Sequence, residues 1–174
     1  MFFHLQLTKN VVVPPKQHGP KLREWLLEKL KEDVEGTCDG RYGYIILVTS
    51  VNDVGDPFIA DDGTAAAKFR VTYECVVMRP FKGEVIDCVV TQATLFGVHA
   101  TAGPMSVFVS KKMLPADHQW SGDANPSWVS DDGLSRIQKD SEVRVRIVGW
   151  KMDGASIYCI ATLNSNFLGS LQEA

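Results

Sequence analysis

The sequence lacks the long apolar stretches that mark membrane proteins. No run of apolar residues approaches the ~18 that a membrane-spanning helix requires. The opening residues, Met1-Phe2-Phe3-His4-Leu5-Gln6-Leu7, have neither the basic start nor the cleavage site of a secretory signal peptide, and they predict a strand. We therefore expect a protein that stays inside the cell and has no membrane partner.

Cysteine spacing and net charge exclude further classes. The four cysteines, Cys38, Cys75, Cys88 and Cys159, include no C-x-x-C pair, which argues against zinc ribbons and redox motifs. Three of them lie in apolar runs, where small buried side chains are the favoured interpretation. The net charge of −3 lacks the basic excess of proteins that coat duplex DNA. Any nucleic-acid binding is therefore expected to come from a local patch, to be weak, or to need help from partners.

Catalytic motifs are missing as well. The histidines are isolated, without H-x-x-x-H or H-x-E spacing: His4, His18, His99 and His118. Neither a phosphate-binding P-loop nor a Gly-x-Ser-x-Gly elbow occurs. The acidic pairs Asp61-Asp62 and Asp131-Asp132 lie among Gly and Ser, where turn formation explains them. We expect no catalytic residue, no metal and no cofactor.

The first half of the chain mixes strand and helix signals. After the opening strand and an extended segment ending at Pro15, His18-Gly19-Pro20 predicts the start of a helix. Apolar residues then recur at steps of three and four, as on one helix face: Leu22, Trp25, Leu26, Leu30 and Val34. Asp39-Gly40 predicts a hairpin turn before a strand over 42–51, in which Gly43 is a possible bulge. A loop over 52–66 and a strand over 67–78 complete an α+β domain, residues 1–80.

The second half predicts strands throughout. They cover 84–95, 98–101, 107–110, 142–148 and 157–163, with a polar insert over 115–135. In the fourth strand Val143, Val145 and Ile147 alternate with two outward arginines. Five short strands with an insert between the third and fourth predict an all-β Greek-key barrel of the OB type, residues 81–174.

Two stretches of this barrel, Leu95-Phe96-Gly97-Val98-His99 and Met105–Ser110, place flat rings beside small residues. Each stretch predicts a strand, and a strand that buries one face leaves the rings of its other face without cover. Exposed rings on a small barrel are typical of single-stranded nucleic-acid binding. The alternatives are barrel-core packing for Phe96 and Phe108 and a solvated strand face for Arg144 and Arg146.

From residue 81 onward the pattern resembles the OB-fold module named after a ribosomal small-subunit RNA-binding protein. The matching segments are Cys88-Val89-Val90, Phe96-Gly97-Val98-His99, Phe108-Val109-Ser110 and Val143-Arg144-Val145. This resemblance implies RNA stacking on Phe96, His99 and Phe108. It also implies phosphate contacts from flanking basic side chains: Lys82, Lys111, Lys112, Arg144 and Arg146.

The whole chain resembles the family of larger stalk subunits of RNA polymerase II, the seventh-largest subunit, which has an archaeal homologue with the same two-domain plan. The most specific segments are Arg79-Pro80-Phe81-Lys82-Gly83-Glu84-Val85 and Gly103-Pro104-Met105. Shorter ones add to them: Met1-Phe2-Phe3-His4, Asp33-Val34-Glu35-Gly36-Thr37-Cys38, Gly40-Arg41-Tyr42-Gly43-Tyr44 and Phe167-Leu168-Gly169. Paralogues in other nuclear polymerases share this plan, and the similarity is greatest to the polymerase II type.

The resemblance implies a non-catalytic nuclear subunit. A truncated RNP-like first domain would dock on the polymerase core through two loops, with these contact residues: His18, Gly19, Pro20, Asp56, Pro57 and Phe58. The smaller, helical fourth subunit would pair along both domains, against apolar strands at 42–48 and 157–161. The barrel would contact nascent single-stranded RNA during initiation and elongation.

Each of these interpretations has an alternative. The two loops could be plain surface turns, and the apolar strands could be covered by the other half of the chain. The chain could serve a paralogous nuclear polymerase, or act as a free-standing OB-fold RNA-binding factor in translation or decay.

Overall fold

The structure is a computed structural model that describes residues 1–59, 63–122, 125–154 and 156–171. Asp61 and Asp62, for which turn formation was predicted, lie outside the described residues. The chain divides into two compact units, Met1–Arg79 and Pro80–Ala174. Among the described residues, no helix is long and apolar enough to cross a membrane.

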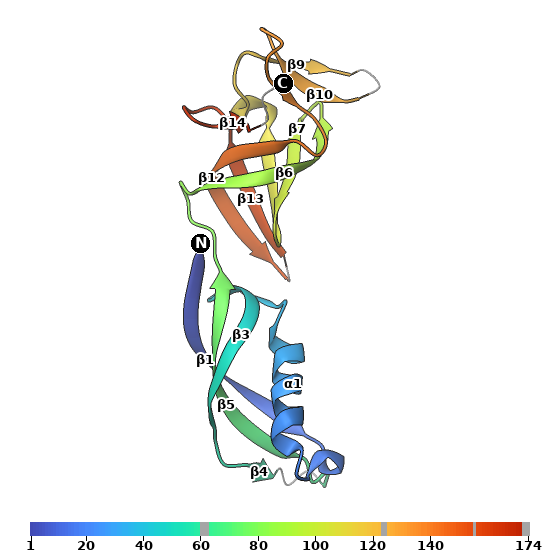
Figure 1. Cartoon of the computed structure of the whole chain (residues 1–174), viewed down its shortest axis with the longest axis vertical. Coiled ribbons are helices and arrows are strands. Elements are labelled where there is room, and N and C mark those ends of the chain that lie inside the picture. The colour runs from blue at the N-terminus through green and yellow to red at the C-terminus, as the bar shows by residue number, and fades with distance from the viewer. Residues whose placement is uncertain (60–62, 123–124, 155, 172–174) are drawn as a thin grey trace. The chain divides into compact units, whose positions relative to one another are not determined.

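The first unit is an antiparallel sheet with a helix against one face (Figure 1). The strands follow the order β1-β5-β3-β2, and β4 pairs with β5. In the described part of this unit the elements are β1 (Phe2–Val13), η1 (Pro15–Gln17), α1 (Leu22–Val34), β2 (Cys38–Asp39), β3 (Gly43–Val54), β4 (Phe58–Ile59) and β5 (Ala67–Met78). The β1-α1-β3-β5 succession is the beginning of the β-α-β-β-α-β plan, which confirms the predicted α+β, truncated RNP-like domain.

The core of the first unit lies between α1 and the sheet. Leu26, Leu30 and Val34 of α1 are buried, as the helical spacing predicted. On β5 the alternating residues from Phe69 to Val77 are buried as well. The helix begins at Leu22, so Pro20 precedes the first turn instead of lying within it.

The apolar residues of strand β3 do not alternate with a period of two, because the strand contains bulges. Its pairing with β5 shifts three times, between Ile45 and Leu47, between Val48 and Ser50, and between Val51 and Asp53. Each bulge adds a residue and increases the local twist. The core-facing positions therefore recur every third residue: Ile45, Val48, Val51 and Val54.

The predicted bulge at Gly43 is wrong, because Gly43 pairs regularly with Asp39 at the start of the strand. Glycine is needed there for another reason. Its φ is +101°, and a Cβ at this position would lie 2.5 Å from the carbonyl oxygen of Met78. Gly43 thus allows two strands to approach closely at the hairpin.

The second unit is a closed five-stranded barrel with a small accessory sheet. Its described elements are β6 (Val85–Thr94), β7 (Gly97–Ala102), β8 (Met105–Ser110), η2 (Lys111–Met113), β9 (His118–Ser121), β10 (Ser127–Ser130), β11 (Arg136–Ile137), β12 (Glu142–Asp153), β13 (Ser156–Thr162) and β14 (Gly169–Ser170). The order β13-β8-β7-β6-β12 closes through the pairing of β12 with β13. Strands β8 and β13 run parallel. This architecture confirms the predicted OB-fold barrel.

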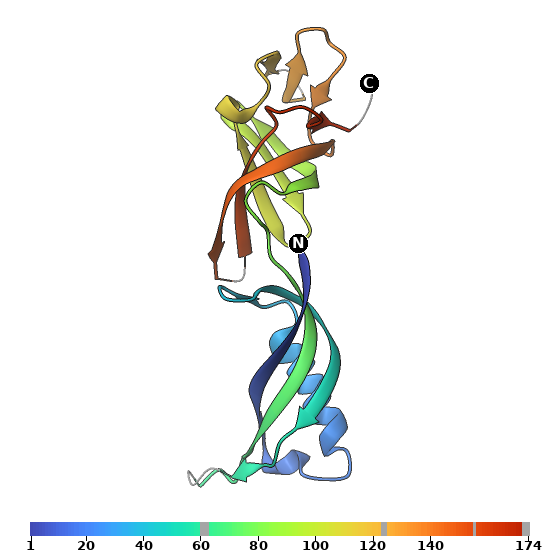
Figure 2. The same cartoon turned by 90° about the vertical axis from the view of Figure 1, so that its left-hand side faces the viewer.

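The barrel closes because β12 changes its partner. Its residues up to Arg146 pair with β6, and its residues from Arg146 onward pair with β13, with a bulge between Ile147 and Gly149. Figure 2 shows this strand, in orange, crossing the barrel obliquely. The predicted inward residues Val143, Val145 and Ile147 are all buried.

Two details of the second unit differ from the predictions. Leu95 and Phe96, expected at the start of a strand, form the turn between β6 and β7. The polar insert over 115–135 contains strands that its composition did not indicate: β9 and β10, which pair with each other, and β10 also pairs with β11. The side chain of Trp128 in β10 is buried, so the insert has an apolar anchor.

We expect Gly97→Ala to destabilise the barrel. Gly97 has a φ of +151°, and an added Cβ would overlap the carbonyl oxygen of Val109 on β8. Combined strain and overlap should lower the free energy of unfolding by about 2–4 kcal/mol. Urea denaturation of the full chain measures this, with Gly149→Ala as the control because nothing lies within 4 Å of a Cβ there. Equal midpoints for the two variants would contradict the argument.

Candidate nucleic-acid interface

A pair of flat rings lies on the outer surface of the barrel. His99 and Phe108 are direct cross-strand partners on β7 and β8. Their ring centroids are 4.7 Å apart and the rings are tilted by 40°. The residues on either side of them in sequence, such as Val98 and Val107, are buried inside the barrel. Core packing is therefore wrong as the alternative for Phe108, whose half-buried ring faces outward.

Phe96 extends this ring surface at the β6–β7 turn. Its side chain is 78% exposed, so core packing is wrong for this residue as well. The turn itself is well supported: the Phe96 carbonyl accepts a hydrogen bond from the Lys111 backbone N–H at 2.9 Å. The Thr94 hydroxyl donates to the Gly97 carbonyl at 2.9 Å. A hydrogen-bonded turn therefore presents the Phe96 ring to solvent.

The insert buttresses the same turn. The indole N–H of Trp128 donates to the carbonyl of Thr94 at 3.1 Å. The Lys111 ammonium lies over the Trp128 ring, 5.8 Å from its centroid, and makes a cation–π contact with it. Trp120 packs against Trp128 with centroids 5.5 Å apart. The sequence prediction missed this role of the insert, for which the two tryptophans in a polar segment were the available signal.

The predicted cations fall into two groups. Lys111 accompanies the rings, whereas Arg144 and Arg146 lie on β12, which β6 separates from β7 in the sheet order. Lys82 belongs with the arginines, because the next residue, Gly83, donates its N–H to the carbonyl of Ile147. Lys82, Lys111, Lys112 and Arg146 are exposed. The cations that the resemblance implies as phosphate contacts thus lie on two parts of the barrel.

Arg144 is not a free cation. It lies directly opposite Asp87 of β6, and its guanidinium donates to both carboxylate oxygens at 2.7 and 2.9 Å. These hydrogen bonds lower the pKa of Asp87 below its usual value and raise that of Arg144. Arg144 is held in an ion pair on a strand face that is open to solvent, since its side chain is 42% exposed, so the solvated-face alternative is compatible with the structure. Its charge is largely compensated for any phosphate ligand.

The two predicted docking loops meet at one end of the first unit. Ala67, the first residue of β5, pairs with both Val13 of β1 and Ile59 of β4. The register therefore brings the segment that contains His18, Gly19 and Pro20 to the same end as the one that contains Asp56, Pro57 and Phe58 (Figure 1). All six residues are exposed. The Phe58 side chain is 67% exposed, which leaves it available as an apolar anchor.

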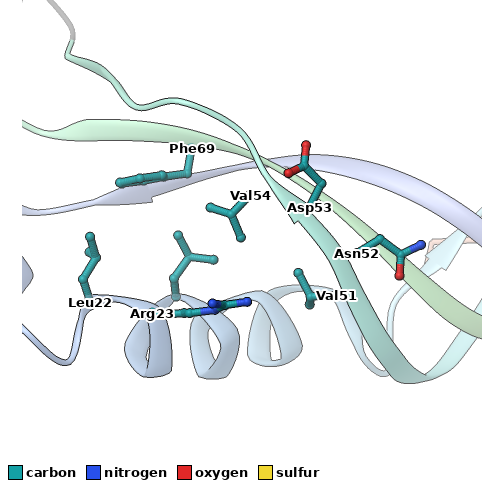
Figure 3. A pocket seen from close by; sticks show the side chains of 8 residues that line it. Leu22, Arg23, Val51, Asn52, Asp53, Val54 and Phe69 are labelled. Atoms are coloured by element: carbon teal, nitrogen blue, oxygen red, sulfur yellow. The ribbon is translucent and has the colours of Figure 1, made fainter.

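A hollow of about 320 Å³ opens beside these loops, between α1 and β3. Its lining comprises Leu22, Arg23, Leu26, Val51, Asn52, Asp53, Val54 and Phe69. Figure 3 shows Leu22 and Val54 directed into the space between helix and sheet, whereas Asp53 is directed away from it. The hollow thus combines an apolar floor with a polar rim, a form that suits an inserted apolar side chain.

The open face of the first sheet carries a polar network around Glu74, beside exposed apolar side chains such as Phe2 and Leu47. Glu74 of β5 accepts hydrogen bonds from Asn52 at 2.9 Å and from Ser50 at 3.1 Å, which lower its pKa. His4 lies 3.6 Å from the same carboxylate and 3.1 Å from the hydroxyl of Thr49. RNP-type RNA binding relies on aromatic rings on this face. The network around Glu74 supports the barrel, not this sheet, as the surface for stacked bases.

The cysteines are packed as small apolar side chains. Cys75, Cys88 and Cys159 are buried, as predicted from the apolar runs around them. Burial raises the pKa of Cys88 to about 12 and that of Cys159 to about 11. In the part of the chain that the structure describes, no cluster of His, Cys, Asp and Glu could hold a metal ion.

Comparison with known proteins identifies both units. Residues 8–65 match the family described as "SHS2 domain found in N terminus of Rpb7p/Rpc25p/MJ0397", and residues 79–160 match the S1 RNA binding domain. The DNA-directed RNA polymerase II subunit RPB7 of Glycine max is 43% identical over 99% of this chain and 98% of its own length. The DNA-directed RNA polymerase II subunit 7 of Arabidopsis thaliana is 42% identical with the same coverage. The chain belongs to the RPB7 family of RNA polymerase II subunits.

The relatives also separate the polymerase types. The DNA-directed RNA polymerase V subunit 7 of Arabidopsis thaliana is 29% identical over 99% of both chains, against 42% for the polymerase II subunit of the same plant. The sequence resemblance to the polymerase II type is thereby confirmed. The S1 match covers all the predicted RNA-binding residues, from Lys82 to Arg146.

We expect Arg144→Gln to return the pKa of the Asp87 carboxyl toward its ordinary value. The lowered pKa means that Asp87 stabilises the fold above the unfolded pKa of ~3.9, and that this small contribution is lost as the pH falls through the folded value. Carbonyl-detected NMR titration of the Asp87 side chain measures both proteins. Identical titration midpoints would show that the ion pair does not hold this carboxylate in solution.

Proposed function

We propose that this chain is the non-catalytic larger stalk subunit of RNA polymerase II, acting in the nucleus. The first unit docks on the polymerase core, a smaller helical subunit pairs along the chain, and the barrel contacts RNA as it emerges. The observation that carries the proposal is the match to RPB7 subunits over nearly the full length of both chains. The ring pair on an S1 barrel supports the RNA contact.

The experiment that tests the proposal is affinity purification of the tagged full chain from its own cells. Mass spectrometry should recover the large subunits of RNA polymerase II together with a small helical partner. If the chain is recovered with the subunits of another nuclear polymerase, it belongs to that polymerase and the assignment to RNA polymerase II is rejected. Recovery of RNA without any polymerase subunit would favour the free-standing RNA-binding factor.

The docking end of the first unit is suited to a rigid contact. A proline in each loop, Pro20 and Pro57, restricts the backbone and so reduces the conformational entropy that the loop loses on binding. Phe58 supplies an exposed ring at this end of the unit. The hollow between α1 and β3 offers a place for an apolar side chain of the polymerase core. Central aromatic anchors contribute most of the binding energy in many interfaces.

We expect Phe58→Ala to weaken docking. Loss of a central aromatic anchor costs about 2 kcal/mol or more, which corresponds to roughly a thirtyfold loss of affinity. Pull-down of purified core polymerase by the tagged chain measures the loss. Leu134→Ala is the control, since it removes an exposed apolar side chain from the insert of the other unit. Equal recovery by the two variants would contradict a role for Phe58.

The helical partner is expected on the outer face of β13. Ile157, Cys159 and Ala161 are buried inside the barrel, whereas Tyr158 and Ile160 are 52% and 53% exposed. The inner face is covered within the single chain, and cover of the outer face by a partner stays a prediction. The outer face has the apolar character that a partner helix requires.

We expect the double substitution Phe96→Ala and Phe108→Ala to weaken binding of single-stranded RNA. Each stacked base contributes ~1–3 kcal/mol, so the loss should be at least about tenfold. Filter binding measures the affinity, and circular dichroism checks that the barrel remains folded. Leu95→Ala is the matched control, because it removes an exposed apolar side chain without a ring from the same turn. Unchanged affinity in the folded double variant would reject the stacking role.

A further inference from the structure

Phe167 has the most exposed large apolar side chain among the described residues. Its side chain is 95% exposed, and its backbone adopts a φ of +66°. This conformation is rare for a bulky residue and persists only where the surrounding structure enforces it. The ring is therefore presented to solvent at a cost that no packing within the described chain offsets.

The segment around Phe167 is fixed at both ends. Before it, the N–H of Leu163 donates to the carbonyl of Met113 at 2.8 Å. After it, Gly169 and Ser170 form β14 and pair with β12. Between these anchors the N–H of Leu168 donates to the carbonyl of Ser165 at 3.2 Å, which closes a turn with Phe167 in its third position. The ring thus stands on a supported turn of the barrel.

Arginines of β12 lie beside this ring. A hollow of about 460 Å³ is lined by Val85, Asp87, Arg144, Arg146, Asn166, Phe167 and Leu168. Asp87 compensates the charge of Arg144. Arg146 is exposed, and the described residues give it no ion pair. One uncompensated guanidinium therefore shares a hollow with an unpacked ring.

We propose that Phe167 and Arg146 form a second subsite for single-stranded RNA, with a base stacked on the ring and a phosphate on the guanidinium. This inference rests on the proposed RNA contact of the barrel and adds a site to it. An aromatic face beside a cation is the combination that single-strand binders use, because every base has a stacking face and every nucleotide a phosphate. The Asn166 side chain can donate to a phosphate or accept from a base in the same hollow.

RNA is favoured over an apolar protein partner by the surroundings of the ring. The hollow contains Asp87, Arg144, Arg146 and Asn166, and a nucleotide offers both a flat base for the ring and a phosphate for the guanidinium, whereas an apolar side chain offers nothing to the polar groups. This subsite also lies on the β12–β14 side of the barrel, whereas the ring pair lies on β7 and β8. A sufficiently long strand could engage both.

The test compares variants of the full chain in binding to a fluorescent oligouridylate of about 16 nucleotides, the upper site size of an OB fold. Phe167→Ala should weaken binding about tenfold, and Phe167→Tyr, which keeps a ring, should restore it. Arg146→Gln should weaken binding and reduce the dependence of the affinity on salt. Leu134→Ala should bind as the unchanged chain does. Photo-crosslinking of 4-thiouridine RNA should label the peptide that contains Phe167.

Each outcome decides the proposal. If Phe167→Ala binds RNA normally while the Phe96 and Phe108 double variant does not, the second subsite is rejected and the proposed RNA contact stands. If the unchanged chain binds no RNA, both are rejected. If Phe167→Ala binds RNA normally but loses recovery of a protein partner, the ring serves protein docking and the subsite is rejected.

Discussion

The barrel depends on one strand that pairs with two others. Arg146 of β12 lies opposite both Val85 of β6 and Thr162 of β13, so the strand changes partner at this residue. Closure removes the open edges of the sheet and fixes its register. Because side chains alternate between the two faces of a strand, the buried series Val143, Val145 and Ile147 leaves no freedom in which residues face outward. The positions available for a ligand are consequences of this closure.

The outward positions acquire their chemistry from neighbours on other strands. His99 becomes part of a ring pair only because β7 and β8 bring Phe108 opposite to it. Arg144 becomes compensated only because β6 brings Asp87 opposite to it. Gly97 lets the β7 backbone approach β8 at the edge of the ring pair. A residue type therefore indicates what a position can do, and the register decides what it does.

Features that depend on local sequence patterns could be predicted, whereas those that depend on contacts between distant strands could not. Strand β5 and helix α1 were predicted almost to the residue, because their buried positions follow periods of two and of about 3.6 that chain geometry imposes locally. The period of three in β3 arises from bulges against β5, and no local pattern predicts it. The strands of the insert were missed because their polar composition hides the anchoring by Trp128. The ring residues were found by motif, whereas the Asp87–Arg144 pair joins segments distant in sequence.

The distribution of charge limits the kind of RNA contact that the barrel can make. The chain carries a net charge of −3, and Asp87 compensates one of the two arginines on β12. Affinity from counterion release grows with the number of phosphates neutralised, so it must be small here. Stacking on rings depends little on base identity, because every base has a stacking face. The RNA contact that we propose therefore relies on stacking and requires no particular RNA sequence.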